Sequence, residues 1–83
     1  MYIVVEHQIS NPQKFWEIAA ALKLPNEIKL HSTFPNPGGT KAVCLWEGKE
    51  LQDIKKIVED GVGQFSKNEY FSVETKNAMG LPN

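Results

Sequence analysis

The stretch that decides the fold is residues 27–47, EIKLHSTFPNPGGTKAVCLWE, in the middle of the chain. Both ends of this stretch are rich in the β-branched, aromatic and other apolar residues that favour strands. Between them, residues 35–39 (PNPGG) contain only residue types that promote turns. We therefore expect a β-hairpin, with one strand over 27–34 and the next over 40–47.

A helix pattern and one further strand flank the hairpin on each side. On the N-terminal side, residues 2–9 (YIVVEHQI) predict a strand, and hydrophobic residues recur at helical spacing over 12–22. On the C-terminal side, helical spacing runs from Leu51 to Gly61, and residues 69–75 (EYFSVET) predict the last strand. The element order is therefore strand, helix, strand, strand, helix, strand.

This order predicts a single α+β domain of the ferredoxin-like type over residues 1–83. In that βαββαβ fold the four strands form one antiparallel sheet, and both helices cover the same side of it. Right-handed crossovers place the first and third strands in the centre. We call the uncovered side of the sheet the open face.

Alternation along the strands divides the sheet residues between the two faces. The residues expected under the helices are Ile3, Val5, Ile28, Leu30, Val43, Leu45, Phe71 and Val73. The residues expected on the open face are Tyr2, Val4, Glu6, Lys29, His31, Thr33, Ala42, Cys44, Trp46, Tyr70, Ser72 and Glu74. Because several of these are apolar, an isolated copy would expose a large hydrophobic patch, and we expect something to cover it.

Composition and charge exclude several classes of partner. The 83 residues include nine lysines but no arginine, and the formal net charge is −1. Because arginine is the usual reader of phosphate and guanine, we expect no nucleic-acid partner. No apolar run approaches the ~20 residues of a membrane helix, and no signal peptide is recognisable, so we expect a cytoplasmic protein without a membrane partner. A single cysteine excludes an internal disulfide.

The topology, the length and the half-apolar open face resemble those of the dimeric α/β-barrel superfamily. Its members pair two such sheets, open face to open face, and include cofactor-free monooxygenases, muconolactone-isomerase-like enzymes, haem-degrading proteins and stress-responsive barrels. The resemblance implies a homodimer. Met79 and Leu81 indicate that the tail packs on another surface, for which the second subunit is one candidate. A weaker similarity, carried by Cys44 on the second hairpin strand, is to small nickel-binding ferredoxin-like proteins.

His31 and Glu6 are the candidate acid and base residues. His31 is expected in mid-strand on the open face, and imidazole can act as acid, base or metal ligand near neutral pH; the alternative is a structural histidine at a subunit interface. A carboxylate such as Glu6 on a central strand is costly to bury unpaired. It is either a general base with a raised pKa or a partner for Lys29 or His31. His7 is expected to be solvated or in contact with a loop.

Trp46, Tyr70 and Cys44 are the candidates for binding a ligand. Trp46 and Tyr70 would be walls around a flat molecule, unless they only pack at the dimer interface. Cys44 is expected near His31 across the hairpin, where the two would hold a borderline-soft divalent metal. The alternative is that Cys44 is a small buried hydrophobe. The sequence contains no motif for an organic cofactor, so we expect no cofactor other than this metal.

Three functions are consistent with this arrangement. The first is a small-molecule-binding protein, whose enzyme form is a cofactor-independent oxygenase or isomerase acting on a flat organic molecule. Its cavity would lie between the helices and the sheet or inside the dimer. The second is a metal-binding or sensing protein that uses His31 and Cys44. The third is a structural or interaction module that acts through the dimer itself.

Overall fold

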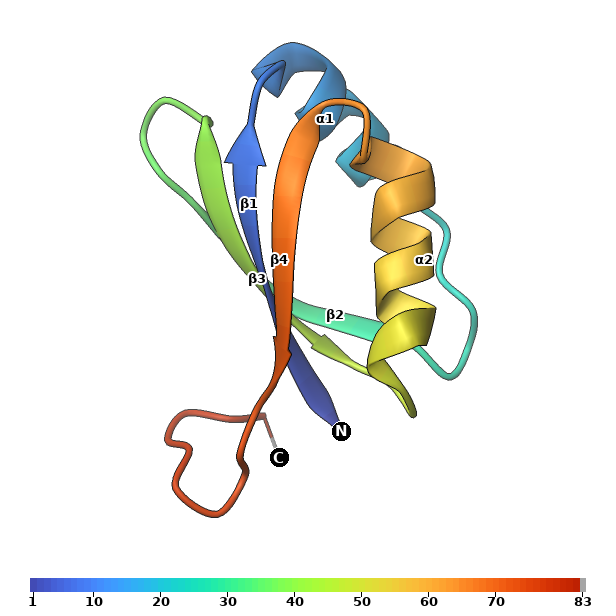
Figure 1. Ribbon diagram of the computed structural model, residues 1–83, viewed down its shortest axis with the longest axis vertical. Helices are drawn as coiled ribbons and strands as arrows, with labels where there is room; N and C mark the ends of the chain where they lie inside the picture. Colours follow the sequence, from blue (N-terminus) through green and yellow to red (C-terminus); the bar gives the residue numbers. More distant parts are fainter. Residues whose placement is uncertain (83) are drawn as a thin grey trace.

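The six expected elements form in the expected order in the computed structural model, which describes residues 1–82 (Figure 1). They are β1 (Tyr2–Ile9), α1 (Pro12–Ala21), β2 (Lys29–Pro35), β3 (Lys41–Glu47), α2 (Leu51–Val62) and β4 (Ser66–Ser72). The strands form one antiparallel sheet in the order β2-β3-β1-β4, with both helices on one side. The predicted ferredoxin-like fold is therefore confirmed, with β1 and β3 in the centre.

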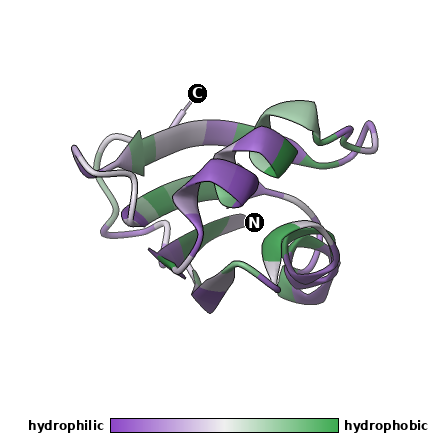
Figure 2. Cartoon of the chain, turned by 90° about the horizontal axis from the view of Figure 1, so that it is seen from above, coloured by the Kyte–Doolittle hydropathy of each residue, from purple (hydrophilic) through white to green (hydrophobic). Residues whose placement is uncertain are grey.

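Local sequence signals set the two helices. The side-chain oxygen of Asn11 caps α1 by accepting a backbone N–H of the first turn at 3.1 Å. α2 is amphipathic and buries Ile54, Val58 and Val62, which recur at helical spacing. Seen from above, α2 turns its hydrophobic side toward the rest of the chain and its hydrophilic side outward (Figure 2). Within residues 1–82, no helix is long and apolar enough to cross a membrane.

The core lies between the sheet and the helices. The inward positions of β1 are held by Ile3, Val5, His7 and Ile9, all of which are buried. They pack with Phe15 of α1 and with the buried side chains of α2. The expectation that Ile3 and Val5 lie under the helices, with Val4 and Glu6 on the open face, is confirmed.

The expected faces of β3 are wrong. The residues of β3 under the helices are Ala42, Cys44 and Trp46, which are only 4%, 5% and 2% exposed. Val43 and Leu45 are on the open face instead. Both sets are apolar, so alternation alone does not distinguish them. A one-residue difference in register then exchanges the whole strand between the two faces.

A β-bulge at His31 also changes the expected faces of β2. Leu30 lies opposite Trp46, but after the bulge Thr33 lies opposite Cys44. Residues directly opposite in an antiparallel pair share a face, so Leu30 and Thr33 both lie on the helix side. The strict alternation expected for β2 therefore holds only as far as the bulge, and Thr33 is not on the open face.

The faces of β4 are also the reverse of those expected. The strand spans Ser66–Ser72 instead of 69–75. Tyr70 pairs with Val5 and lies under the helices, whereas Phe71 is on the open face. The inward positions of β4 are therefore held by residues with polar groups, which are Ser66, Asn68 and Tyr70.

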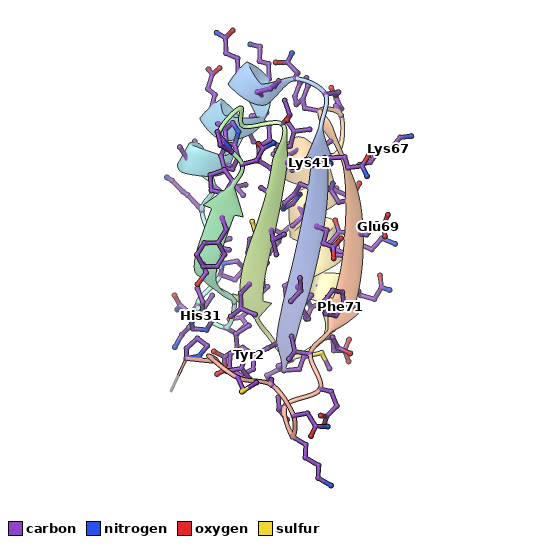
Figure 3. All side chains as sticks on the ribbon, turned by 90° about the vertical axis from the view of Figure 1, so that its left-hand side faces the viewer. Tyr2, His31, Lys41, Lys67, Glu69 and Phe71 are labelled. Carbon is purple, nitrogen blue, oxygen red and sulfur yellow. The ribbon has the colours of Figure 1, made fainter. Side chains whose placement is uncertain are left out.

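Side chains on the open face form rows that run across the strands (Figure 3), and three of these rows lie between the Tyr2–Glu47 pair and the hairpin turn. The apolar row contains Leu45, Val4 and Phe71. The acidic row contains Phe34, Val43, Glu6 and Glu69. The basic row contains Lys41, Gln8 and Lys67. Hydrophobic and charged side chains therefore lie next to one another on this face.

The C-terminal tail turns back toward the start of β1 (Figure 1). The phenol of Tyr2 donates a hydrogen bond to the carbonyl of Pro82 at 3.1 Å. The carboxylate of Glu74 accepts backbone N–H groups from the turn that follows it. Met79 is 95% exposed, so the packing expected for its side chain is not made within one copy of the chain.

Candidate functional site

A cavity of about 270 Å³ lies between α1 and the sheet. The side chains of α1 that line the cavity become smaller along the helix, from Phe15 in the first half to Ala19 and Ala20 near the end. The small alanine side chains leave room for the cavity. The walls are mainly apolar and include Phe15, Trp16, Ala19, Leu30, Cys44 and Trp46. Leu30 and Ala20 are exposed, so the mouth of the cavity lies between α1 and β2.

His7 supplies a titratable group to this wall. Its side chain is 4% exposed, because alternation along β1 points it inward with Val5 and Ile9. Its Nδ1 lies 2.6 Å from Oδ1 of Asn68 on the neighbouring strand β4. The ring of Phe15 packs edge-on against the imidazole, with 5.1 Å between the ring centroids. These contacts hold the imidazole in one orientation.

A chain of hydrogen bonds that begins at Glu59 fixes the tautomer of His7. The carboxylate of Glu59 can only accept, so Asn68 directs its Nδ2 toward it, at 2.8 Å, and its Oδ1 toward His7. Because Oδ1 also only accepts, Nδ1 of His7 must carry the proton. Of the two ring nitrogens of His7, Nδ1 is the one that forms a hydrogen bond within residues 1–82. Nε2 therefore keeps a lone pair, on the side of the ring away from β4.

Burial keeps this imidazole neutral near pH 7. Loss of hydration lowers the pKa of His7 below its usual value, and the hydrogen bond with Asn68 and the charge of Glu59 offset only part of this effect. For Glu59, desolvation opposes ionisation, but hydrogen bonds from Tyr70 and Asn68 outweigh it and lower the pKa. Desolvation and the bond to Glu59 raise the pKa of the Tyr70 phenol. The array is therefore a neutral histidine, an amide, a carboxylate and a phenol.

Trp46 supplies a buried donor without a partner. Its side chain is 2% exposed, and its indole Nε1–H forms no hydrogen bond within residues 1–82. By contrast, Trp16 of the same cavity donates its Nε1–H to the carbonyl of Gly39 at 3.0 Å. An unpaired buried donor costs about 1–3 kcal/mol. An acceptor atom bound beside Trp46 would remove that cost.

Cys44 lines the cavity as a thiol. Burial raises its pKa, and the hydrogen bond with Thr33, whose Oγ1 lies 3.6 Å from Sγ, opposes this only in part. A raised pKa disfavours the thiolate, which is the reactive form. Cys44 therefore matches the alternative of a small buried hydrophobe rather than a nucleophile.

The predicted metal-binding pair is not brought together. His31 is on the open face at the bulge in β2, where its Nε2 lies 2.8 Å from Oε1 of Glu47 and its ring lies 5.8 Å from that of Tyr2 (Figure 3). Cys44 is on the other side of the sheet. In the described part of the chain, no group of three or more His, Cys, Asp or Glu residues is placed to hold a metal ion.

Glu6 is on the open face as expected, but it is not the partner of His31. It is exposed, and its neighbours across the sheet are Val43 and Glu69. The carboxylate beside His31 is Glu47, whose pKa the hydrogen bond from His31 lowers. Glu6 is therefore neither buried nor paired with His31. A general base with a raised pKa would need the burial, and a partner of His31 would need the contact.

Of the predicted ligand-binding residues, Trp46 and Cys44 line the cavity and Tyr70 does not. Tyr70 is instead bonded to Glu59 at the edge of the array around His7. His7 itself was not predicted to be a site residue. The signal was nevertheless present, because His7 occupies the same alternating series as the apolar inward residues of β1.

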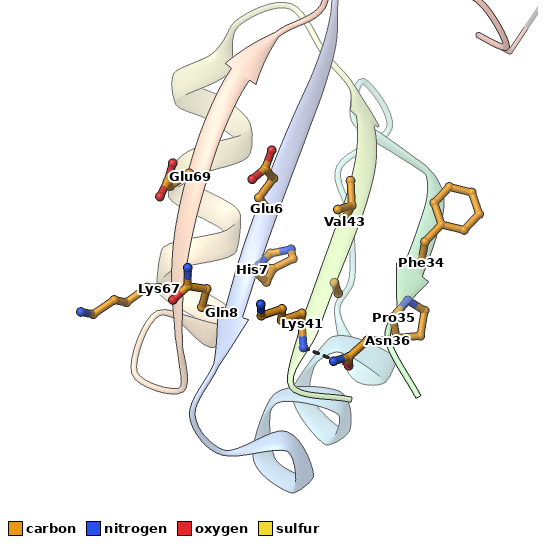
Figure 4. Close-up of a pocket in the computed structure, with 11 residues that line it drawn as sticks. Glu6, His7, Gln8, Phe34, Pro35, Asn36, Lys41, Val43, Lys67 and Glu69 are labelled. Atoms are coloured by element: carbon orange, nitrogen blue, oxygen red, sulfur yellow. Dashed lines mark hydrogen bonds between the residues drawn. The ribbon is translucent and has the colours of Figure 1, made fainter. Parts of the chain in front are cut away.

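A second hollow, of about 450 Å³, lies on the open face (Figure 4). Side chains of the acidic and basic rows line it, among them Glu6, Phe34, Lys41, Lys67 and Glu69. These charged groups are exposed and already hydrated, so water competes with any small ligand for them. The cavity under the helices is the better candidate site.

We expect His31→Gln to have little effect on stability or on the cavity. Water competes for the hydrogen bond between His31 and Glu47, because both side chains are partly exposed. The midpoint temperature of unfolding should change by no more than about 3 °C in differential scanning calorimetry. A loss of more than about 10 °C would mean that His31 is needed to hold the bulge.

Comparison of the chain with known protein families, curated proteins and solved structures gives no match. The geometry of the cavity and the chemistry of its walls are therefore the guides to function.

Proposed function

We propose that this protein binds a small, flat organic molecule in the cavity between α1 and the sheet. The observation that carries the proposal is the unpaired indole N–H of Trp46 in a mainly apolar wall. Buried donors are normally hydrogen-bonded, and an oxygen of a bound ligand would satisfy this one. Small-molecule sites combine an apolar wall with a few polar groups in the same way.

The size and lining of the cavity define the class of ligand. A cavity of about 150 Å³ holds benzene, so one of about 270 Å³ has room for a molecule of two fused rings. Phe15, Trp16 and Trp46 supply aromatic faces and edges for flat rings to contact. The ligand class is therefore a mainly apolar ring compound with at least one oxygen acceptor.

The probes 2-indanone and indane test the proposal, since they share a two-ring skeleton and differ in one carbonyl oxygen. We expect 2-indanone to bind about tenfold more tightly, because only it can accept the Trp46 N–H. In Trp46→Phe this preference should disappear while indane affinity is retained. NMR titration measures both affinities. Equal affinity of the wild-type protein for the two probes would contradict the proposal.

Trp16→Phe is the matched control, since Trp16 lines the same cavity but already donates to Gly39. It should keep the preference for 2-indanone and lose about 1 kcal/mol of stability with the hydrogen bond to Gly39. Trp46→Phe removes an unpaired donor, so its stability should be close to that of the wild-type protein. A loss of the preference in both variants would point to general damage to the cavity.

The same cavity would serve the enzyme form of this function, a cofactor-independent oxygenase or isomerase. The metal-binding alternative lacks its expected pair of ligands, because His31 and Cys44 lie on opposite faces of the sheet.

We also propose that two copies pair through their open faces, as in the dimeric α/β-barrel superfamily. Phe34, Val43 and Phe71 are 67%, 43% and 49% exposed there. Glu6 and Glu69 are direct neighbours whose charges repel within one copy. A two-fold rotation that sets the acidic row of one copy on the basic row of the other would pair these charges. Such an interface should bury more than ~1,000 Å² in total.

A further inference from the structure

We infer that His7 is a proton-transfer residue, whose Nε2 removes a proton from the carbon beside the carbonyl group of a small ketone held in the cavity. Trp46 would bind the oxygen of the same carbonyl through its indole N–H. The inference rests on the proposed function and narrows its ligand to a substrate class, the small enolisable ketones.

The neighbours of His7 fix the tautomer and the orientation of its imidazole. Nδ1 carries the proton and is bound to Asn68, so Nε2 is the nitrogen with the lone pair. The imidazole nitrogens lie on different sides of the ring, so a ring that directs Nδ1 to β4 directs Nε2 away from β4, and His7 lines the cavity. The contact with Phe15 and the bond to Asn68 restrict rotation of the ring. Asn68 is therefore a positioning residue.

The second requirement is a group that stabilises negative charge on the oxygen. A fixed N–H donor in a site with little water does this more effectively than a mobile one in solvent. Trp46 Nε1–H is such a donor. The indole is buried, and its N–H forms no hydrogen bond with any other residue of the described chain. His7 and Trp46 line the same cavity.

The step balances without any further reactant. The C–H bond breaks and its proton passes to Nε2, while the electron pair forms a C=C bond to the carbonyl carbon. The π pair of the C=O bond moves to oxygen, and the resulting enolate accepts the Trp46 N–H. The imidazolium then returns the proton to the same carbon or, in a β,γ-unsaturated ketone, to the γ carbon. The second route gives the conjugated isomer, so the net reaction is an isomerisation.

Few other charged groups act on His7. From α2, the carboxylate of Glu59 lies beyond Asn68, and its charge favours the imidazolium that forms during the step. From β3, Cys44 lines the cavity as a neutral thiol. From α1, the group in contact with the imidazole is the ring of Phe15. The base therefore meets one stabilising charge and no competing cation among these groups.

Exchange of the CH₂ protons of 2-indanone in D₂O, followed by ¹H NMR, tests the inference. These protons lie between the carbonyl and the aromatic ring, so their removal gives a conjugated enolate. We expect the wild-type protein to accelerate the exchange above an equal concentration of free imidazole. His7→Gln should lower the protein-dependent rate by at least about 100-fold. His31→Gln removes the other histidine and should leave the rate unchanged.

The pH profile gives a readout that loss of folding would not imitate. The rate should rise with the fraction of neutral His7, with its inflection below the pH at which an exposed histidine titrates, since burial lowers this pKa. Asn68→Asp places a carboxylate beside Nδ1, which favours the imidazolium, so the inflection should move to higher pH.

Two outcomes would overturn the inference. The first is a wild-type protein that binds 2-indanone but exchanges its protons no faster than free imidazole does. The second is a folded His7→Gln variant that exchanges them at the wild-type rate. In both cases the binding of 2-indanone, and with it the proposed function, would still stand. Failure of 2-indanone to bind at all would instead refute the proposed function and this inference together.

Discussion

Replacement of Ala19 by phenylalanine is expected to abolish the binding of 2-indanone. Ala19 is partly buried in the α1 wall of the cavity, and a benzyl group there would occupy much of the space of about 270 Å³. We expect the affinity to fall by at least about 100-fold, because probe and side chain cannot occupy the same volume. The fold should be retained, since the added ring enters space that is already empty. NMR titration measures the affinity, and circular dichroism checks the fold.

Ala21→Phe is the matched control for this experiment. Ala21 ends the same helix but is exposed and is not part of the cavity wall. Its affinity for 2-indanone should stay within about twofold of the wild-type value, as expected for a surface substitution remote from the ligand. Retention of wild-type binding by Ala19→Phe would show that the ligand binds elsewhere.

Val43→Lys is expected to convert a homodimer into monomers. Val43 is on the central strand β3, next to Phe34 and Glu6 on the open face. Within one copy the new lysine can reach Glu6 or solvent, so the monomer should stay folded. In a face-to-face pair two such charges would be buried, and the dissociation constant should rise by at least about 100-fold. Sedimentation equilibrium of both proteins measures the change.

Ala21→Lys is the matched control for dimer formation. Ala21 is exposed at the end of α1, on the helix side of the sheet, so a lysine there should leave the dissociation constant nearly unchanged. A wild-type protein that sediments as a monomer would refute the pairing of open faces. Dissociation caused by Ala21→Lys would mean that the helix side belongs to the interface.

The fold was predictable because each element has its own local signal. The PNPGG turn of residues 35–39 lies between two runs with high strand propensity, and a helix pattern flanks the hairpin on each side. These signals are short-range, so the element order does not depend on knowing the tertiary contacts. Right-handed crossovers then leave one sheet order, which the structure has.

The face of each strand was harder to predict, because it depends on one-residue details. In the middle of β3 both alternating series are apolar, so periodicity does not decide which series lies under the helices. On β2 the bulge at His31 breaks the alternation, and no residue type in the sequence marks it. On β4 the apolar residues Phe71 and Val73 suggested the inward series, whereas polar bonds to α2 hold the other series inside.

The site was predicted only in part for the same reason. Trp46 and Cys44 line the cavity, but on the helix side and without His31. His31 lies on the open face as expected, whereas His7, expected to be solvated or in contact with a loop, is buried under the helices. Two features of His7 pointed in opposite directions. Its place in the apolar alternating series of a central strand indicated burial, and its place near the end of that strand indicated exposure. The first is the stronger signal.

Strand β2 is poorly suited to recruit another chain along its outer edge. A regular edge strand presents a row of unpaired N–H and C=O groups that can template a fibre. In β2 the bulge at His31 interrupts that row, Pro35 lacks an N–H, and Lys29 adds a charge. The other edge, β4, carries Lys67 and Glu69. Both edges therefore carry features that disfavour edge-to-edge addition, so a concentrated solution of the protein should resist the growth of β-sheet filaments.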